Sequence, residues 1–430
     1  MTDEFIQPLL AWYDENKRIL PWRDKHNAYY TWVSEIMLQQ TRVEAVKPYF
    51  ERFIRELPDI PALAVCPEEK LLKLWEGLGY YSRVRNMQLA AREMVEKYNG
   101  RLPEDFSLLI SLKGIGSYTA GAIASIAYGI PVPAVDGNVF RVVTRMTEDS
   151  EDITRPAFRK KTESALQEII PKDRPGDFNQ AMMELGAVVC VPNGQPKCDL
   201  CPVRGFCQAG LHGTMEKFPV KAPKKPRVVE ERTVLVIQDG SCTAIRKRPP
   251  KGLLAGLYEL PNTEGYLNRE EALEYVKELG AEPLYIEELP DARHIFSHIE
   301  WRMKAYRIRV SSLEQTHVPG ILFADKKESE RNYIITARGR SMPLMVRNSS
   351  VLSSIAESEP FRLTTGRIFC ISPSKYGDSI FSSLASILSA FPRMVLISPL
   401  CTIRRFGCAL SQLGFVLVLK RECTSAIADS

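Results

Sequence analysis

Hydrophobic residues recur at helical spacing through the first half of the chain. Short breaks that contain Gly or Pro, such as Leu57–Pro58 and Gly77–Gly79, separate the apolar segments. This rhythm predicts an all-α domain over residues 1–210. The predicted helices are Phe5–Tyr13, Trp32–Leu38, Val43–Ile54, Lys70–Trp75 and Met87–Val95.

A basic, proline-rich stretch at residues 211–229 is interpreted as an interdomain connector. The periodicity then becomes that of β-strands, and a turn signal follows at Asp239–Gly240. We therefore predict an α+β module over residues 230–327. Its predicted elements are strands at 233–237, 243–245, 257–260 and 299–310 and a helix at 269–279 that ends before Gly280.

The tail, residues 328–430, has a different composition. It is rich in Ser, and its four cysteines (Cys370, Cys401, Cys408 and Cys423) have no ligand spacing. The sequence predicts no fold here, and it leaves open whether the tail is disordered or the product of a shifted reading frame.

The net charge of +5 does not identify a partner. Residues 331–430 hold 12 Lys and Arg against 5 Asp and Glu, whereas residues 1–330 hold 45 against 47. Binding of nucleic acid by the body would need a local basic patch. The chain has no long apolar run and begins with an acidic segment, so we expect a cytoplasmic protein without membrane contact.

Four cysteines (Cys190, Cys198, Cys201 and Cys207) lie in one short segment with the pattern C-x7-C-x2-C-x5-C. Four thiolates suit zinc or a four-iron, four-sulfur (4Fe–4S) cluster, and one compact loop with uneven spacing favours the cluster. Four unrelated buried thiols are the plainer alternative. Lys197 and Arg204 in this loop are candidates for phosphate contact.

A Gly-x-Gly turn lies between two helical segments at residues 112–121. Gly114 and Gly116 would let the backbone approach a phosphate closely, and the next helix would present free N–H groups. A tight helix–helix connection is the alternative interpretation.

Two carboxylates are candidates for acid–base chemistry. Glu35 lies in an apolar helical segment, where burial would raise its pKa. Asp136 follows a Pro-containing apolar loop and would cap a helix that begins near Gly137. Such a pair suits cleavage of a bond to a sugar carbon, although a surface or ion-paired Glu35 would fit the sequence equally well.

Together these motifs resemble the helix-hairpin-helix DNA glycosylases, and most closely the MutY-type adenine DNA glycosylases. The resemblance covers roughly residues 5–325. It rests on the hairpin, Asp136 and the cysteine loop in this order. Further matching segments are Leu20–Arg23, Ser34–Thr41, Gly77–Arg83 and Asp136–Val139.

The resemblance implies catalytic roles for four residues. Glu35 would protonate the flipped adenine and later activate water, and Asp136 would stabilise the oxocarbenium-like sugar. Tyr118 and Asn138 would position these groups. Bifunctional relatives have a lysine where this chain has Tyr118, and tyrosine cannot form a Schiff base. We therefore expect a monofunctional DNA N-glycosylase.

The resemblance also implies DNA contacts. Gln40 and Tyr80 would wedge into the base stack near 8-oxoguanine with support from Leu38, and Arg23 would lie near the adenine pocket. The expected partner is duplex DNA with adenine opposite 8-oxoguanine or guanine, bound by a monomer associated with a bacterial-type nucleoid. The cysteine loop departs from the family in having seven residues, not six, between Cys190 and Cys198.

The module at 230–327 resembles the Nudix-like domain with which such enzymes read 8-oxoguanine. The Glu-rich box of a Nudix hydrolase is out of register here, so we expect binding without hydrolysis. Phe296, Ser297 and His298 match the family's lesion-reading loop, although the same residues are common in ordinary turns.

Three other functions are compatible with parts of the sequence. A bifunctional glycosylase and lyase would share the hairpin, Asp136 and the cluster. A non-catalytic iron–sulfur DNA-binding protein would need neither Glu35 nor Asp136. A nucleotide pyrophosphatase would need an intact Nudix box.

Overall fold

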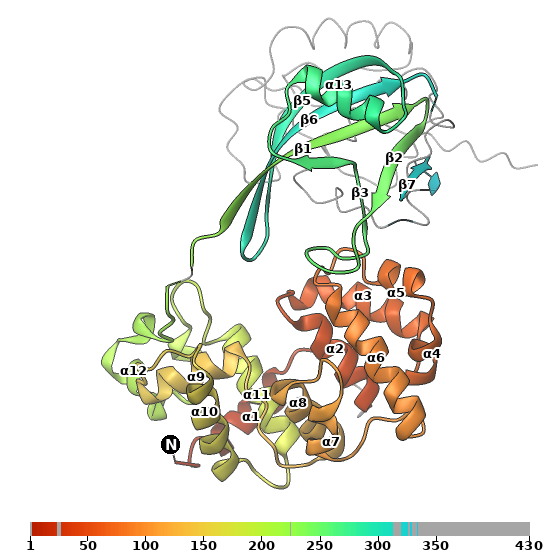
Figure 1. The fold of residues 1–430 in the computed structure, drawn as a ribbon. Helices are drawn as coiled ribbons and strands as arrows, with labels where there is room; N and C mark the ends of the chain where they lie inside the picture. The colour runs from red at the N-terminus through yellow and green to blue at the C-terminus, as the bar shows by residue number, and fades with distance from the viewer. Residues whose placement is uncertain are drawn as a thin grey trace, which may run out of the picture. The chain divides into compact units, whose positions relative to one another are not determined.

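The computed structural model describes residues 2–23, 27–223, 225–312, 320–325, 327, 328 and 333. Its first part is built from helices, as the apolar periodicity predicts, and Figure 1 shows them in two groups. The helices are α1 Ile6–Asn16, α2 Ala28–Leu38, α3 Val43–Glu56, α4 Ile60–Val65, α5 Glu68–Leu74, α6 Ser82–Lys97, α7 Phe106–Ser111, α8 Ser117–Tyr128, α9 Gly137–Thr147, α10 Pro156–Ile169, α11 Pro175–Val188 and α12 Gln208–His212.

Side-chain caps define where several of these helices begin. Asn27 accepts hydrogen bonds from two backbone N–H groups at the start of α2, and Asp59 and Asp105 each accept one at the starts of α4 and α7. These bonds satisfy amide groups that have no partner within the helix. At the other end of α8, Gly129 adopts a left-handed conformation (φ 67°), which stops the helix.

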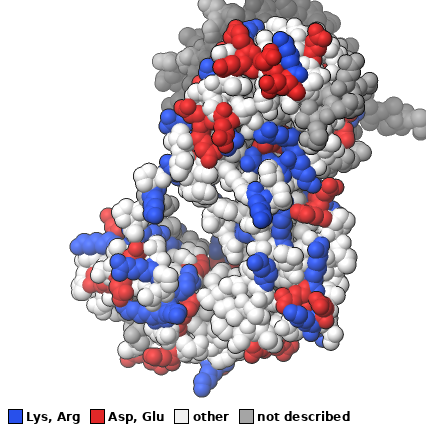
Figure 2. All heavy atoms as spheres, viewed as in Figure 1, with Lys and Arg blue, Asp and Glu red and all other residues white. Residues whose placement is uncertain are grey.

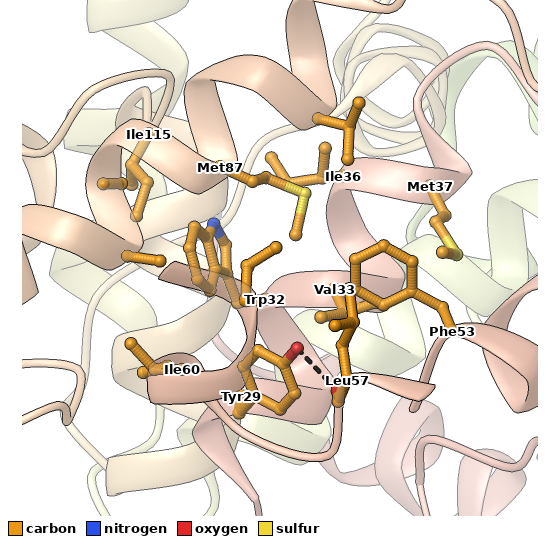
Figure 3. Packing of buried hydrophobic residues seen from close by; sticks show 14 of the residues in the cluster. Tyr29, Trp32, Val33, Ile36, Met37, Phe53, Leu57, Ile60, Met87 and Ile115 are labelled. Atoms are coloured by element: carbon orange, nitrogen blue, oxygen red, sulfur yellow. Dashed lines mark hydrogen bonds between the residues drawn. The ribbon is translucent and has the colours of Figure 1, made fainter. Parts of the chain in front are cut away.

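The helices pack around two hydrophobic cores. The first surrounds α2, where Trp32 and Ile36 lie with Met87 of α6 and Ile115 (Figure 3). The hydroxyl of Tyr29 donates to the carbonyl of Leu57 at 2.9 Å, so the one polar atom of that buried ring is satisfied.

The second core joins the N-terminus of the chain to its later helices. Phe5, the N-cap residue of α1, and Leu9 of α1 pack with Phe140 of α9, Phe158 of α10 and Phe178 of α11. Helices α1 and α11 therefore lie side by side although more than half of the helical part separates them in sequence.

The second part of the chain is a mixed sheet with the strand order β3-β2-β1-β6-β5, from which β4 pairs with β1 and β7 with β2. Strands β1 and β6 are parallel, and the other pairs are antiparallel. Helix α13 (Arg269–Glu278) packs Ala272 and Val276 against one face of the sheet. The strands are β1 Val228–Asp239, β2 Cys242–Lys247, β3 Tyr258–Glu259, β4 Asn262–Glu264, β5 Pro283–Ile295, β6 Ile299–Val310 and β7 Ile321–Ala324.

The predicted helical core and the α+β module are both confirmed, and the structure also contains elements that were not predicted, among them α4, α10, α11, β4 and β7. Helix α12 and a short 3-10 turn at Met215–Lys217 occupy the first part of the predicted connector. Strand β5 was not predicted, because Pro283, Pro290 and its charged residues interrupt the alternating pattern. The predicted tail at 328–430 lies outside the described residues except for 328 and 333. Within the described ranges, no helix is long and apolar enough to cross a membrane.

Candidate active site

A cavity of about 590 Å³ opens in the helical part of the molecule. Helices α2, α8 and α11, the start of α9 and the segment after α1 contribute to its wall. Residues predicted from three separate sequence motifs therefore meet at one place. The predicted residues that line it are Arg23, Glu35, Leu38, Gln40, Tyr118, Asp136 and Asn138.

Glu35 is a buried carboxyl group on α2 and is only 7% exposed. The Tyr118 hydroxyl, on α8, donates a short hydrogen bond to its Oε2. Burial raises the pKa of Glu35 to about 7, with a further rise from the charge of Asp136, while the Tyr118 hydrogen bond and the charge of Arg23 act in the opposite direction. Near neutral pH a substantial fraction of Glu35 therefore holds a proton that it can donate.

Asp136 lies in a different environment, at the N-cap of α9. Its Oδ1 accepts the backbone N–H groups of Asn138 and Val139, both at 2.8 Å, and its Oδ2 accepts Nδ2 of Asn138 at 2.7 Å. Burial raises the pKa of Asp136 above its usual value, and these three hydrogen bonds oppose the rise. The bonds and the positive end of the α9 dipole favour the ionised form and fix its orientation.

Arg141, which the sequence analysis missed, connects this carboxylate to the cysteine loop. Its Nη2 donates to Oδ1 of Asn138 at 2.9 Å, and its Nε donates to the carbonyl oxygen of Cys190 at 2.7 Å. A second bond from Nη2 reaches the carbonyl of Gly186 at 2.7 Å. The one signal in the sequence is its position on α9, one turn after Gly137 and three residues after Asn138.

Glu184 is a second residue that the sequence analysis missed. Its side chain is 1% exposed and pairs with Nη2 of Arg23 at 2.8 Å and with Arg18. Burial would raise the pKa of Glu184, but the hydrogen bond from Arg18 and the charge of Arg23 outweigh it and lower the pKa. This pairing holds Arg23 at the cavity. Gln180 and Met183, which are on α11 like Glu184, also line the cavity.

The two expected wedge residues are exposed and have unusual backbone conformations. Gln40 follows α2 with φ 59°, and Tyr80 precedes α6 with φ 47° and is 49% exposed. Both values lie in the left-handed region, which non-glycine residues seldom adopt. Gln40 lines the cavity, whereas Tyr80 does not.

The Gly-x-Gly turn forms a tight connection between α7 and α8. Gly114 has φ 80°, and a Cβ there would lie 2.7 Å from Cβ of Asn86. Gly116 is the N-cap residue of α8, and a Cβ there would meet no atom within 4 Å. The backbone at Gly116 is therefore open to a ligand at the helix N-terminus.

The four predicted cysteines line one small pocket together with Arg145 and Arg204. Nη1 of Arg145 donates to Sγ of Cys190 at 3.2 Å, and the backbone N–H of Gly210 donates to Sγ of Cys207 at 3.4 Å. Such donors stabilise thiolate sulfur and so fit a metal-bound group. A single metal ion is a different case, because among the described residues no group of three or more His, Cys, Asp or Glu side chains could hold one.

The loop expected to read the lesion forms the turn between β5 and β6. Phe296 packs edge-on against His294 and Trp301, with ring centroids 4.4 and 5.0 Å apart, whereas Ser297 and His298 are exposed. One apolar side chain therefore anchors the turn. The His298 side chain is exposed, and the Ser297 hydroxyl forms a hydrogen bond with the Tyr80 hydroxyl at 2.6 Å.

The carboxylates of the disrupted Nudix box have structural partners. Glu271 accepts the backbone N–H of Asn268 at 2.7 Å in a capping box at the start of α13. The buried carboxylate of Glu259 pairs with Arg246 and Arg248. Both carboxylates are therefore engaged in contacts within the module.

Charged side chains of both signs cover the face seen in Figure 2. Lys and Arg are prominent over the helices that carry the cysteine loop, with Asp and Glu among them. The surface on this side thus offers local basic groups without a uniformly positive face.

Two family models match the chain. A model described as "HhH-GPD superfamily base excision DNA repair protein" matches residues 33–172, and a NUDIX domain model matches residues 232–334. Together with the hairpin, the cavity and its carboxyl pair, these matches define the class as helix-hairpin-helix base-excision repair proteins with a Nudix-like module.

Curated relatives give the particular family. The adenine DNA glycosylase of Mus musculus is 35% identical over an alignment of 373 positions, which covers 73% of this chain and 72% of the relative. That of Buchnera aphidicola (Acyrthosiphon pisum) is 35% identical over 312 residues, 72% of this chain and 88% of the relative. The chain belongs to the adenine DNA glycosylase family.

Solved structures also resemble part of the chain. A trapped endonuclease III–DNA covalent intermediate is 25% identical and covers 50% of this chain and 99% of its own, with a TM-score of 0.43.

Proposed function

We propose that this protein is a monofunctional adenine DNA glycosylase that removes adenine facing 8-oxoguanine or guanine in duplex DNA. The observation that carries the proposal is the carboxyl pair in one cavity. Glu35 is buried and holds a proton near neutrality, whereas Asp136 accepts three hydrogen bonds at a helix N-terminus. Cleavage of a glycosidic bond requires one neutral and one ionised carboxyl group in the same site.

The proposed reaction breaks the bond between C1′ of the sugar and N9 of adenine. Glu35 donates its proton to the flipped adenine, so the bonding electron pair leaves with a neutral base. The carboxylate of Asp136 stabilises the positive charge that develops on the sugar. Glu35, now ionised, takes a proton from water as the water oxygen bonds to C1′, which restores both carboxyl groups.

The other cavity residues support this chemistry in the proposal. Tyr118 orients Glu35, and Asn138 orients Asp136. Tyr118 also distinguishes this reaction from that of a lyase, because its phenol offers no amine to form a Schiff base. Arg23, Gln40 and Leu38 would contact the extruded base or the strand that it leaves.

We also propose that Cys190, Cys198, Cys201 and Cys207 hold a 4Fe–4S cluster. The support is the set of four soft donors at one pocket and the hydrogen bonds that two of the sulfur atoms accept. When bound, the cluster would serve as a structural brace for the loop. The backbone carbonyl of Cys190 would then fix the position of Arg141, and Arg141 would in turn fix that of Asn138.

In this proposal the Nudix-like module reads the oxidised base. Phe296, Ser297 and His298 would meet 8-oxoguanine, Tyr80 would enter the stack beside it, and Gly114 and Gly116 would bind a backbone phosphate. We further propose that the protein acts as a monomer in a bacterial-type cytoplasm, associated with the nucleoid. The proposed domain limits are 1–210, 211–229 and 230–327.

The decisive experiment is a single-turnover reaction with a duplex that carries adenine opposite 8-oxoguanine. The products are resolved with and without hot alkali. Strand breaks that appear only after alkali are expected from a monofunctional enzyme. Breaks without alkali would show a lyase, and no base release by cluster-loaded protein would contradict the proposed activity.

A further inference from the structure

The proposed wedge consists of two segments, which carry Gln40 and Tyr80, and the side chain of Arg83 contacts both. We propose that Arg83 is a positioning residue that locks the segments carrying Gln40 and Tyr80 into one rigid unit for entry into the base stack. The inference rests on the proposed function, because it assumes that these two residues enter DNA.

Arg83 donates hydrogen bonds to backbone carbonyls on both segments. Its Nη1 reaches the carbonyls of Ile36 at 2.5 Å and Gln39 at 2.9 Å, at the end of α2. Its Nη2 reaches the carbonyls of Leu78 and Gly79, each at 3.2 Å. One planar guanidinium therefore joins two stretches of chain that are about forty residues apart in sequence.

On each segment one acceptor lies directly before a wedge residue, and each wedge residue has a left-handed backbone. Gln39 precedes Gln40 (φ 59°), and Gly79 precedes Tyr80 (φ 47°). A non-glycine residue in this conformation is strained and persists only where neighbouring contacts impose it. The hydrogen bonds to the preceding carbonyls provide that constraint on both segments.

Two aromatic rings hold the guanidinium in place. Its Cζ lies 5.4 Å from the ring centroid of Trp75 and 5.7 Å from that of Tyr80 itself. Nε1 of Trp75 donates to the carbonyl of Gly79 at 3.1 Å, so this ring also constrains the second segment. Burial lowers the pKa of Arg83 to about 10, which still leaves the side chain charged at neutral pH.

The guanidinium of Arg83 is held in this one arrangement although one of its donors lacks a partner among the described residues. Its Nε is buried and has no hydrogen-bond partner within the described part of the chain. A buried donor without a partner costs free energy, which the surrounding structure must offset. We infer that the bonds from Nη1 and Nη2 maintain this geometry, and that its benefit is a wedge that loses little conformational freedom when it enters DNA.

The test compares Arg83→Lys with Arg92→Lys in the full chain. Lysine keeps the charge and most of the stem but lacks the planar fork. Arg92 is a matched control on the same helix, since its Nε also donates to a backbone carbonyl, that of Ala64, at 3.1 Å. Single-turnover base release is measured with adenine opposite 8-oxoguanine and with adenine opposite a stable abasic analogue, where the absence of a partner base makes extrusion easier.

For Arg83→Lys we expect a loss of at least about tenfold on the first duplex and less than about threefold on the second, because the chemical step is intact. Arg92→Lys should match the wild type on both. Equal losses on the two duplexes, or no loss on either, would overturn the inference. Failure of the wild type itself would contradict the proposed function instead.

Amide hydrogen exchange of the wild-type protein keeps the inference testable if the lysine variant does not fold. The segments at 39–41 and 79–81 should exchange with one common opening free energy, because one side chain holds both. Clearly different opening free energies would contradict the shared lock.

Discussion

At the residue scale, we predict that the buried carboxyl of Glu35 determines how activity depends on pH. Its pKa is raised to about 7 by burial, and the proposed reaction needs its protonated form. Base release under single-turnover conditions should therefore fall as the pH rises through about 7 and should reach a plateau below it, until Asp136 protonates. A rate that stays constant from pH 6 to about pH 9 would remove Glu35 from the role of acid.

Tyr118 should control where that fall occurs. Its hydrogen bond to Glu35 stabilises the ionised carboxylate and so lowers the pKa. Tyr118→Phe should move the alkaline limb of the pH–rate profile to higher pH. The matched control is Tyr128→Phe, on the same helix, whose hydroxyl donates to the carbonyl of Leu102 at 2.8 Å. A limb that moves to lower pH in Tyr118→Phe would contradict this reading.

The same carboxyl should reduce the stability of the protein at high pH. The folded-state pKa of about 7 lies above the ordinary value of 4.5, so unfolding releases a proton and the free energy of unfolding falls as the pH rises between these values. Glu35→Gln should therefore be more stable than the wild type at pH 8, by up to about 3 kcal/mol. Urea titrations at pH 8 and at about pH 5 test this, because the difference should shrink toward acid pH. A constant difference would show that titration is not its cause.

At the scale of elements, the close approach of α11 to the start of α9 sets the position of Asp136. A Cβ on Gly186 would lie 2.6 Å from Cβ of Asn138 and 3.0 Å from its backbone oxygen. Asn138 donates two of the three hydrogen bonds to Asp136. A side chain added at position 186 would therefore displace Asn138 and disturb these two hydrogen bonds.

Gly186→Ala should therefore lower the rate of base release by about tenfold or more, because small misplacements of reacting groups are costly. Gly205→Ala is the matched control, since a Cβ there meets no atom within 4 Å and its backbone is not left-handed. Substrate binding is measured in parallel by titration with the mispaired duplex. Unchanged base release in Gly186→Ala would show that the helices move apart without disturbing Asp136.

The sequence predicted the elements that local pattern controls. Apolar periodicity located α2, α3 and α6, and the cap at Asp136 located the start of α9. It did not predict β5, Arg141, Glu184 or the dual contacts of Arg83. These depend on which segments meet in space, and no local pattern records that a guanidinium will find carbonyls some forty residues away.

At the scale of the whole molecule, the proposed function assigns chemistry and lesion reading to different parts of the chain. The lining of the catalytic cavity comes from residues 18–221, whereas Phe296, Ser297 and His298 lie at the β5–β6 turn. The two properties should therefore respond to different substitutions. Loss of a contact to 8-oxoguanine should change the choice of duplex and leave bond cleavage intact.

Ser297→Ala provides that test, because it removes the exposed hydroxyl, together with its 2.6 Å hydrogen bond to the Tyr80 hydroxyl, and leaves the Phe296–Trp301 contact in place. Loss of one neutral hydrogen bond of about 1 kcal/mol should reduce the preference for 8-oxoguanine over guanine about fivefold. The rate of base release from the adenine–guanine duplex should not change. Ser241→Ala, another exposed serine in a strand connection of the sheet, is the matched control. An equal fall on both duplexes would indicate that the turn supports catalysis generally, and an unchanged preference would remove Ser297 from lesion recognition.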